Sequence, residues 1–426
     1  MGMTLTEKIL AHSSNSKTVT PGDIIFSNVD KAMIHDVSGP GVIKVFKELE
    51  KKGHKLEKLW DPDRVWISED HFVPASDRIS ADNVIQLTKW AQKYGIKKHF
   101  KYGMGQYGIC HTISHEEGLV LPGEVYVGGD SHTNTTGAIG AFSAGLGHTD
   151  IAYVLKHGKI WFKVPETMLF KVTGKKPDYI MAKDIILNII SDIGTDGANY
   201  KAMQFSGNVI DTMEMEERFT LTNMTTEAGA KNGIIEPDNT TVDYLRTRLG
   251  ALEFNLVKGD PDAEFGEVFD YDCEKMEPSV AKPYSPENVV PVRDVQGTEI
   301  DKAYIGSCTG AKLSDLRSAA KILEGKKVKV RTEVLPAAQS IYIKAIKEGL
   351  VTIFMESGAV IGPPTCGACC GAHMGVLAKD EICISTTNRN FPGRMGHVDS
   401  QTYLASPLVA AASAITGKIT DPRDLN

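Results

Sequence analysis

Short apolar runs that end in glycine or in a reactive polar residue recur along the chain and give the first indication of its fold. Each run is too short for a helix and is rich in β-branched or aromatic residues, which is typical of a buried strand. The predicted strands cover residues 65–67, 125–127, 303–305, 359–361 and 382–385.

Between these runs the apolar residues repeat with the period of a helix. Residues 41–49 place Val42, Val45, Phe46 and Leu49 on one face, and residues 183–193 and 313–323 follow a similar pattern. The glycine-containing run 137–147 is predicted as a tightly packed helix, and residues 218–221 as a strand. Strands that alternate with helices predict α/β domains whose parallel sheets face a common cleft.

Length and proline content divide the chain further. At 426 residues it exceeds one ordinary hydrophobic core, so several domains are expected. Boundary signals are Val164-Pro165 and the proline-rich stretch 282–291. We therefore predict three α/β domains, at residues 1–165, 166–288 and 289–426, of which the third carries the cysteines discussed below.

Composition excludes two classes of partner. The 47 Lys and Arg residues against 54 Asp and Glu give a net charge of −7, with no basic block longer than two lysines, so no nucleic-acid partner is expected. Residues 131–149 lack charge but are rich in glycine, serine and threonine, and residues 404–415 are too few to cross a bilayer. We expect both to be buried helices and no membrane partner. Seven cysteines without an apolar leader predict a reducing, cytoplasmic location.

Three cysteines follow predicted strands in the last third of the chain. Cys308 comes three residues after the end of the strand at 303–305, and Cys366 and Cys369 follow the strand at 359–361 and a Gly-Pro-Pro breaker. Ligand sites in parallel sheets form at the carboxyl ends of strands, so these thiols are expected together at one sheet edge. Three thiolates fit an iron–sulfur cubane with one iron open to substrate. A zinc ion completed by a nearby histidine and a set of buried unreactive thiols are the alternatives.

Five polar motifs occur in order along the chain: Asp130-Ser131-His132-Thr133, Asn223-Met224-Thr225-Thr226-Glu227, Gly306-Ser307-Cys308-Thr309, Cys366-Gly367-Ala368-Cys369 and Asn388-Arg389-Asn390-Phe391-Pro392-Gly393-Arg394. In this order they resemble the aconitase superfamily, and the likeness covers nearly the whole chain. Within the superfamily the resemblance is greatest to the large subunits of 3-isopropylmalate dehydratase and homoaconitase.

The resemblance implies an aconitase-like fold, three α/β domains around a cleft that contains the cluster, and assigns roles to site residues. The cofactor would be a 4Fe–4S cluster held by Cys308, Cys366 and Cys369, with one iron lacking a protein thiolate. The implied pairs of histidine and carboxylate are His71 with Asp70, His111 with Asp130, and His132 with Glu227, and His71 would protonate the leaving hydroxyl. The remaining implied contacts to substrate or cluster come from His35, Ser131, Asn223, Asn388, Arg389 and Arg394.

The resemblance also implies a partner. The fourth, swivelling domain of single-chain aconitases is expected to be absent, so a separate small subunit would supply the proton-abstracting serine. The expected activity is a hydro-lyase that isomerises a hydroxy acid by dehydration and rehydration, with 3-isopropylmalate in leucine biosynthesis as the leading substrate. Homoaconitase, a dimethylmalate-type dehydratase and a non-catalytic iron sensor are the alternatives.

Overall fold

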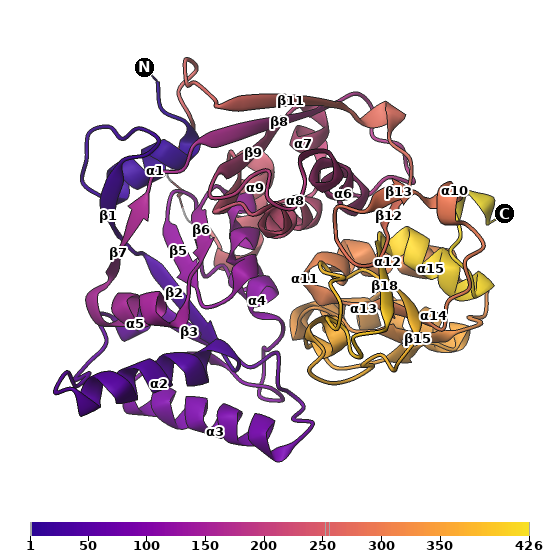
Figure 1. Cartoon of the computed structure of the whole chain (residues 1–426), viewed down its shortest axis with the longest axis horizontal. Helices are drawn as coiled ribbons and strands as arrows, with labels where there is room; N and C mark the ends of the chain where they lie inside the picture. Colours follow the sequence, from indigo (N-terminus) through magenta and orange to yellow (C-terminus); the bar gives the residue numbers. More distant parts are fainter. Residues whose placement is uncertain (1, 252, 255, 426) are drawn as a thin grey trace.

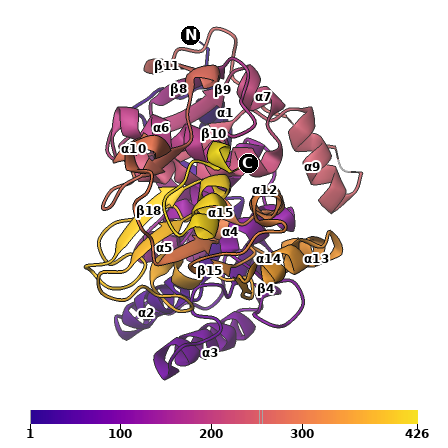
Figure 2. The same ribbon diagram turned by 90° about the vertical axis from the view of Figure 1, so that its right-hand side faces the viewer.

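The computed structural model describes residues 2–251, 253–254 and 256–425, and their strands form four sheets. Two views at right angles place the helices α2 (Ser38–Lys51) and α3 (Arg78–Lys93) at one end of the molecule (Figure 1, Figure 2). The strands β8 (Thr167–Thr173) and β11 (Glu267–Asp272) lie at the opposite end. The elements from β12 (Ser279–Ala281) to α15 (Pro407–Thr416), drawn in orange and yellow, form a lobe at the lower right of Figure 1.

The first sheet contains five parallel strands in the order β4-β3-β2-β5-β6. Its core strands are apolar throughout, as expected for a parallel sheet covered on both faces. The helices α2, α3 and α5 pack together on one side, and α4 contacts β3 from the other. The bounds are β2 Lys31–His35, β3 Val65–Ser68, β4 Lys98–Phe100, β5 Val125–Gly128, β6 Phe142–Gly145, α4 Cys110–Glu116 and α5 His148–His157.

Two smaller sheets follow. A two-stranded antiparallel ribbon joins β1 to β7, and a four-stranded parallel sheet has the order β10-β9-β8-β11. The strongly acidic segment 259–277 contributes the edge strand β11 to this sheet. The bounds are α1 Leu5–Ser13, β1 Ile24–Asn28, β7 Lys159–Lys163, α6 Ala182–Ile193, β9 Ala202–Ser206, α7 Asn208–Thr212, α8 Met215–Asn223, β10 Asn232–Ile235 and α9 Asn239–Leu249.

The fourth sheet has seven strands in the order β13-β12-β18-β17-β14-β15-β16, parallel from β18 to β16 and antiparallel at β12 and β13. The strand β12 joins this sheet although it precedes residue 289, where the third domain was predicted to begin. The strands are β12 Ser279–Ala281, β13 Val289–Pro291, β14 Lys302–Ile305, β15 Arg331–Val334, β16 Val360–Ile361, β17 Ile382–Ser385 and β18 Gln401–Ala405. The helices are α10 Val292–Val295, α11 Ser307–Gly310, α12 Leu313–Leu323, α13 Gln339–Lys347, α14 Leu350–Ser357 and α15 Pro407–Thr416.

Two of the predicted elements are wrong. The run 137–147 is not one helix, because the 3₁₀ helix η2 (Ser131–Ile139) ends at Gly140, whose φ of +81° is left-handed, and β6 follows. Residues 218–221 lie in the helix α8 rather than in a strand. Nearly every side of α8 is buried, so its sequence lacks the polar face that reveals a helix.

No helix in the described ranges combines the length and the apolar character that a membrane span requires. The charge-free segment 404–415 falls largely in α15, as expected, whereas the charge-free segment 131–149 is divided among η2, β6 and the start of α5.

Candidate active site

Parallel strands of the first sheet bring their carboxyl ends, and the polar residues that follow them, to one place. His35 is the last residue of β2, Asp70 comes two residues after β3, and Asp130 two residues after β5. His111 lies in the first turn of α4, and His132 in the first turn of η2. The topology therefore converts five separate sequence positions into one cluster at the edge of the sheet.

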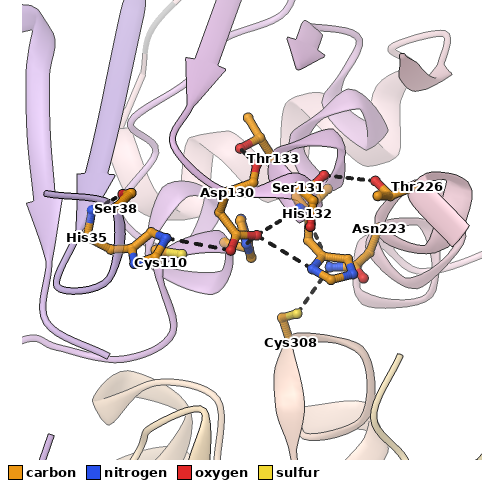
Figure 3. Close-up of polar contacts among 12 residues, drawn as sticks. His35, Ser38, Cys110, Asp130, Ser131, His132, Thr133, Asn223, Thr226 and Cys308 are labelled. Carbon is orange, nitrogen blue, oxygen red and sulfur yellow. Dashed lines mark hydrogen bonds and ion pairs between the residues drawn. The ribbon is translucent and has the colours of Figure 1, made fainter. Parts of the chain in front are cut away.

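Asp130 is the centre of this cluster (Figure 3). Its Oδ1 lies 2.8 Å from Nε2 of His111 and accepts the backbone N–H of His132 at 2.8 Å, while Oδ2 lies 3.5 Å from Nε2 of His35. Burial alone would raise the pKa of Asp130, but the charge and hydrogen bond of His111, with the bonds from His132 and His35, hold it well below its usual value. Asp130 is therefore a carboxylate that orients the imidazoles of His111 and His35 and the backbone of His132.

Asp70 and His71 form a second pair. Nδ1 of His71 lies 2.8 Å from Oδ1 of Asp70, and Oδ2 of Asp70 accepts the backbone N–H of Cys110 at 2.6 Å. Burial opposes ionisation of Asp70, but His71 lowers its pKa below the usual value. Because Asp70 occupies Nδ1, Nε2 of His71 is the nitrogen left to act on a ligand, and it lies 4.0 Å from Oδ2 of Asp130.

Asp36, which the sequence analysis did not select, supports that pair. It is fully buried and accepts the backbone N–H groups of His71, at 3.0 Å, and of Phe72, at 2.7 Å. His35 stacks on the His71 ring with centroids 4.4 Å apart. The only sequence signal for Asp36 was its place directly after His35 at a strand end.

Glu227 links the histidine cluster to an arginine from the last lobe. Its Oε1 lies 2.9 Å from Nε2 of His132 and accepts Nε–H of Arg389 at 2.8 Å. Burial opposes ionisation of Glu227, but His132 and then Arg389 lower its pKa. The buried His111 has a lowered pKa because burial disfavours the imidazolium, against the pull of Asp130. Within the described residues, Nδ1 of His111 has no hydrogen-bond partner.

The three thiols lie in two turns of the seven-stranded sheet. Cys308 is in α11, directly after β14, whereas Cys366 precedes and Cys369 lies within the 3₁₀ helix η5 (Gly367–Cys370). Each is 6% exposed. Burial raises the pKa of Cys308 to about 12 and that of Cys366 well above the usual thiol value.

Two asparagines bridge the thiols and the histidine side. Nδ2 of Asn223 lies 3.1 Å from Sγ of Cys308 (Figure 3). The same nitrogen donates to the Thr135 hydroxyl in η2. Asn388 donates to Asn223, and its amide lies 3.6 Å from Sγ of Cys308 and 3.5 Å from Sγ of Cys369. The backbone N–H of Cys366 donates to the carbonyl of Asp70 at 2.9 Å. The structure therefore brings the thiols and the histidine pairs into one site.

The spacing of the thiols tests which metal group they fit. A tetrahedral zinc ion with Zn–S bonds of 2.3 Å would hold thiolates about 3.8 Å apart. Among the described residues, the three sulfurs do not form a group whose members all lie within 4.8 Å of one another. A larger, sulfur-ligated group fits this spacing better than one zinc ion does.

The remaining selected residues lie around the same site. Arg394 is partly buried, and its Nε has no hydrogen-bond partner among the described residues. Burial opposes its charge, but the negative charges of Cys369 and Cys370 as thiolates, and then of Asp130, raise the pKa of Arg394. Ser131 begins η2 beside Asp130, and its backbone carbonyl accepts the Thr226 hydroxyl at 2.8 Å.

The sequence analysis also missed two buried lysines, Lys183 and Lys312, that contact the backbone near Cys308 and Asn388. Nζ of Lys183 donates to the backbone carbonyls of Thr386 and Thr387, and Nζ of Lys312 donates to the carbonyl of Thr309 at 3.0 Å. A signal for Lys183 was present, because the helical period puts it on the same face of 183–193 as Ile186 and Ile190, which are fully buried.

Comparison with known proteins places this site in a family. The model of the aconitase family (aconitate hydratase) matches residues 7–298 and 293–417. The chain belongs to the aconitase family. The expected resemblance and the expected α/β fold are therefore confirmed, and membership of this family implies a 4Fe–4S cluster.

Similar proteins extend over the full length of the chain. The 3-isopropylmalate dehydratase large subunit of Aquifex aeolicus is 50% identical and covers 100% of this chain and 98% of its own length. Large subunit 1 from Pyrococcus furiosus is 49% identical, with coverages of 100% and 99%. Among solved structures, the holo-form of Thermococcus kodakaraensis aconitase X aligns with a TM-score of 0.49 and 12% identity over 88% of this chain and 89% of that chain.

Proposed function

We propose that this chain is the large subunit of a 3-isopropylmalate dehydratase, a hydro-lyase that interconverts 3-isopropylmalate and 2-isopropylmalate in leucine biosynthesis. The structural observation that carries the proposal is the meeting of three buried thiols with three pairs of histidine and carboxylate in one site. Full-length relatives near 50% identity that bear this name support the choice of substrate. A cytoplasmic location remains a prediction.

The cofactor we propose is a 4Fe–4S cluster held by Cys308, Cys366 and Cys369. Their burial, their spacing and the donors that Asn223 and Asn388 direct at them suit a cluster whose sulfurs accept hydrogen bonds. With three protein thiolates one iron would lack such a ligand, and the bound cluster would supply a Lewis acid that polarises the substrate hydroxyl.

His71 is the proposed acid for the departing hydroxyl. The Asp70 carboxylate 2.8 Å from Nδ1 fixes the ring, so Nε2 is the nitrogen that can exchange a proton with a substrate hydroxyl. Asp36 holds the backbone of His71 in place through its N–H group. The nitrogen that exchanges the proton is therefore held in one orientation before a substrate binds.

The pairs around Asp130 and Glu227 would orient the substrate and control protons near it. Asp130 binds Nε2 of His111, so the free Nδ1 of that neutral ring is the atom that can accept a proton from a ligand hydroxyl or water. Glu227 binds Nε2 of His132 and so keeps Nδ1 of that ring turned toward Asp130, 3.5 Å away. Ser131, between these residues, would donate to a substrate carboxylate.

The arginines would bind the substrate's carboxylates. Nε of Arg389 is engaged by Glu227, which leaves the two Nη groups for a bidentate contact, whereas Nε of Arg394 is not engaged in the described part of the chain. His35 is placed to contact the substrate beside His71, on which its ring stacks.

The base is expected on another chain. None of the serines in the matched motifs corresponds to the family's proton-abstracting serine, so we propose a small subunit of about 150 residues, the size of one domain, that closes over the site. Closure would exclude water and complete the substrate pocket.

Stepwise reconstitution tests this proposal. The cluster is restored anaerobically in the purified chain, which is assayed with 3-isopropylmalate, homocitrate and dimethylmalate before and after addition of the candidate small subunit. We expect turnover of 3-isopropylmalate only after the addition. Turnover by this chain alone would refute the divided site, preference for homocitrate or dimethylmalate would reassign the substrate, and a cluster without turnover of any of them would favour an iron sensor.

A further inference from the structure

Lys183 carries a buried positive charge that the paired residues of the active site do not explain. Its side chain, near the start of α6, is 2% exposed. Nζ donates to the carbonyl oxygens of Thr386, at 3.1 Å, and Thr387, at 2.5 Å, and lies 3.3 Å from the hydroxyl of Thr309. All three acceptors are neutral.

Two other buried lysines of the same region differ from Lys183 in this respect. Lys312 lies 2.8 Å from the carboxylate of Asp315, and Lys302 lies 2.9 Å from that of Glu333. Within the described residues, Lys183 has no carboxylate at ion-pair distance. A buried charge without an opposite charge is unfavourable, because the polar solvent that stabilised it is lost.

The negative groups near Lys183 belong to the cluster site. Burial lowers the pKa of Lys183 to about 8, an effect that Glu227, and after it Cys369 and Cys308 as thiolates, oppose. Glu227 already binds His132 and Arg389. The anionic charge left to balance Lys183 is therefore that of the thiolates.

The hydrogen bonds of Lys183 also reach both turns that carry these thiols. Thr309 follows Cys308 directly, and its hydroxyl donates to the carbonyl of Thr386 at 2.9 Å. Thr386 and Thr387 precede Asn388, whose amide contacts the sulfurs of Cys308 and Cys369. The ammonium group of Lys183 thus connects the turn that carries Cys308 to the loop that carries Asn388.

We propose that Lys183 is a positioning residue that balances the negative charge of the thiolate-ligated cluster and holds the Cys308 turn against the Asn388 loop. The proposal rests on the cluster site of the proposed function and assigns it an electrostatic partner from α6, which lies outside the five sequence motifs. Removing a nearby positive charge should disfavour the reduced, more negative state of the cluster.

The test compares Lys183→Met with Lys231→Met after anaerobic reconstitution. Lys231 is a matched control, since its partly buried side chain also places Nζ near a backbone carbonyl, that of Gly145, but the charged group that acts on it is Asp150 and not a cysteine. A redox titration followed by electron paramagnetic resonance gives the reduction equilibrium of the cluster. We expect Lys183→Met to shift it about tenfold toward the oxidised state, or about 59 mV for one electron, and Lys231→Met to leave it unchanged.

Loss of iron to a chelator is the second measurement, and we expect it to be faster in Lys183→Met. If that variant does not fold, Lys183→Gln, which keeps a neutral N–H donor, carries the same test. An unchanged reduction equilibrium in a folded variant would overturn the proposal and leave Lys183 a structural lysine. If the wild-type chain itself takes up no cluster, the proposed function fails instead.

Discussion

The site has a histidine side, formed by His71, His111 and His132 with their carboxylates, and a thiol side, formed by Cys308, Cys366 and Cys369. The two sides differ in whether each charged group has an opposite charge beside it before a ligand binds. His71, His111 and His132 each lie 2.8–2.9 Å from a carboxylate, so that side is complete in itself. Cys308 and Cys366 are buried with raised pKa values, and the side chains that contact the Cys308 sulfur are two neutral amides and a hydroxyl. Metal ligation removes thiol protons, so the charge of the thiol side changes on loading, whereas that of the histidine side need not.

Because of this difference, we expect substitutions on the two sides to have different effects. Changes on the thiol side should alter whether the cluster is held, and changes on the histidine side should alter turnover with the cluster still in place. If a substitution on the histidine side caused loss of the cluster, the two sides would be coupled more strongly than their contacts indicate.

The largest effect is expected from Cys308→Ser, Cys366→Ser or Cys369→Ser. Each removes one of three thiolates, and an alcohol is a poor replacement, so both the iron content and the activity should be lost. Iron, sulfide and visible absorbance after anaerobic reconstitution are the measurements. Cys370→Ser is the matched control and should keep the cluster, since Cys370, although adjacent, is more exposed. One stoichiometric zinc ion in a colourless wild-type protein would contradict the assignment.

Asp130→Asn should lower kcat by about 10²- to 10⁴-fold, because the amide cannot hold His111, His132 and His35 in their present orientations. The iron content should equal that of the wild type. Steady-state kinetics with the small subunit present, together with iron analysis of the same sample, gives both values. Loss of iron in this variant would contradict the expectation that the histidine side affects turnover and not cluster binding.

Arg389→Lys and Arg394→Lys should each reduce kcat/KM roughly 10- to 100-fold, as an ammonium cannot make two parallel bonds to a carboxylate and each lost charged hydrogen bond costs about 1.5 to 3 kcal/mol. Arg317→Lys is the control, because Arg317 makes a bidentate pair with Glu348 on an exposed surface. Normal kinetics in both site variants would mean that these arginines do not bind substrate.

Much of this arrangement was predictable because strands of a parallel sheet end at one edge. The apolar runs before Asp70 and Asp130 identified β3 and β5, and the residues that follow these strands converge because both strands belong to one parallel sheet. The run before Cys308 identified β14, which belongs to the seven-stranded sheet, so the same rule does not explain why Cys308 meets the two aspartates. The pairing of Glu227 with both His132 and Arg389 was only half predictable, since it joins parts of the chain 95 and 162 residues apart.

The features that the sequence analysis missed are buried, and burial removes the alternation of polar and apolar residues on which the predictions depend. The helix α8 is buried on nearly all sides, so its residues show no amphipathic period, and the strand prediction for 218–221 failed. Lys183 and Asp36 are charged residues whose buried partners are backbone groups, and backbone groups leave no signature in a sequence.

Asp36→Asn should lower kcat by about threefold to tenfold and leave KM nearly unchanged, since the amide NH₂ cannot accept the N–H groups of His71 and Phe72 as the carboxylate does. KM should stay unchanged because the substitution displaces the proposed acid, His71, and leaves the substrate-binding arginines in place. Asp77→Asn is a matched control, as Asp77 accepts the Ser80 N–H at the start of α3, outside the site. An equal loss of kcat in both variants would point to general destabilisation.

The smallest effect should appear in the acid sensitivity of the cluster-free chain. The folded state lowers the pKa of Glu227, so its contribution to stability is complete above the unfolded value of about 4.3 and is lost as pH falls through the folded pKa. The Gln side chain does not titrate, so Glu227→Gln should unfold at a lower urea concentration than the wild type at pH 6. Below about pH 4 the two midpoints should approach each other, because the wild type loses the contribution that the variant never had. Urea midpoints at pH 6, 5, 4 and 3.5 measure this. A gap that stays constant over the whole range would mean that Glu227 stabilises the fold through packing and not through its charge beside His132 and Arg389.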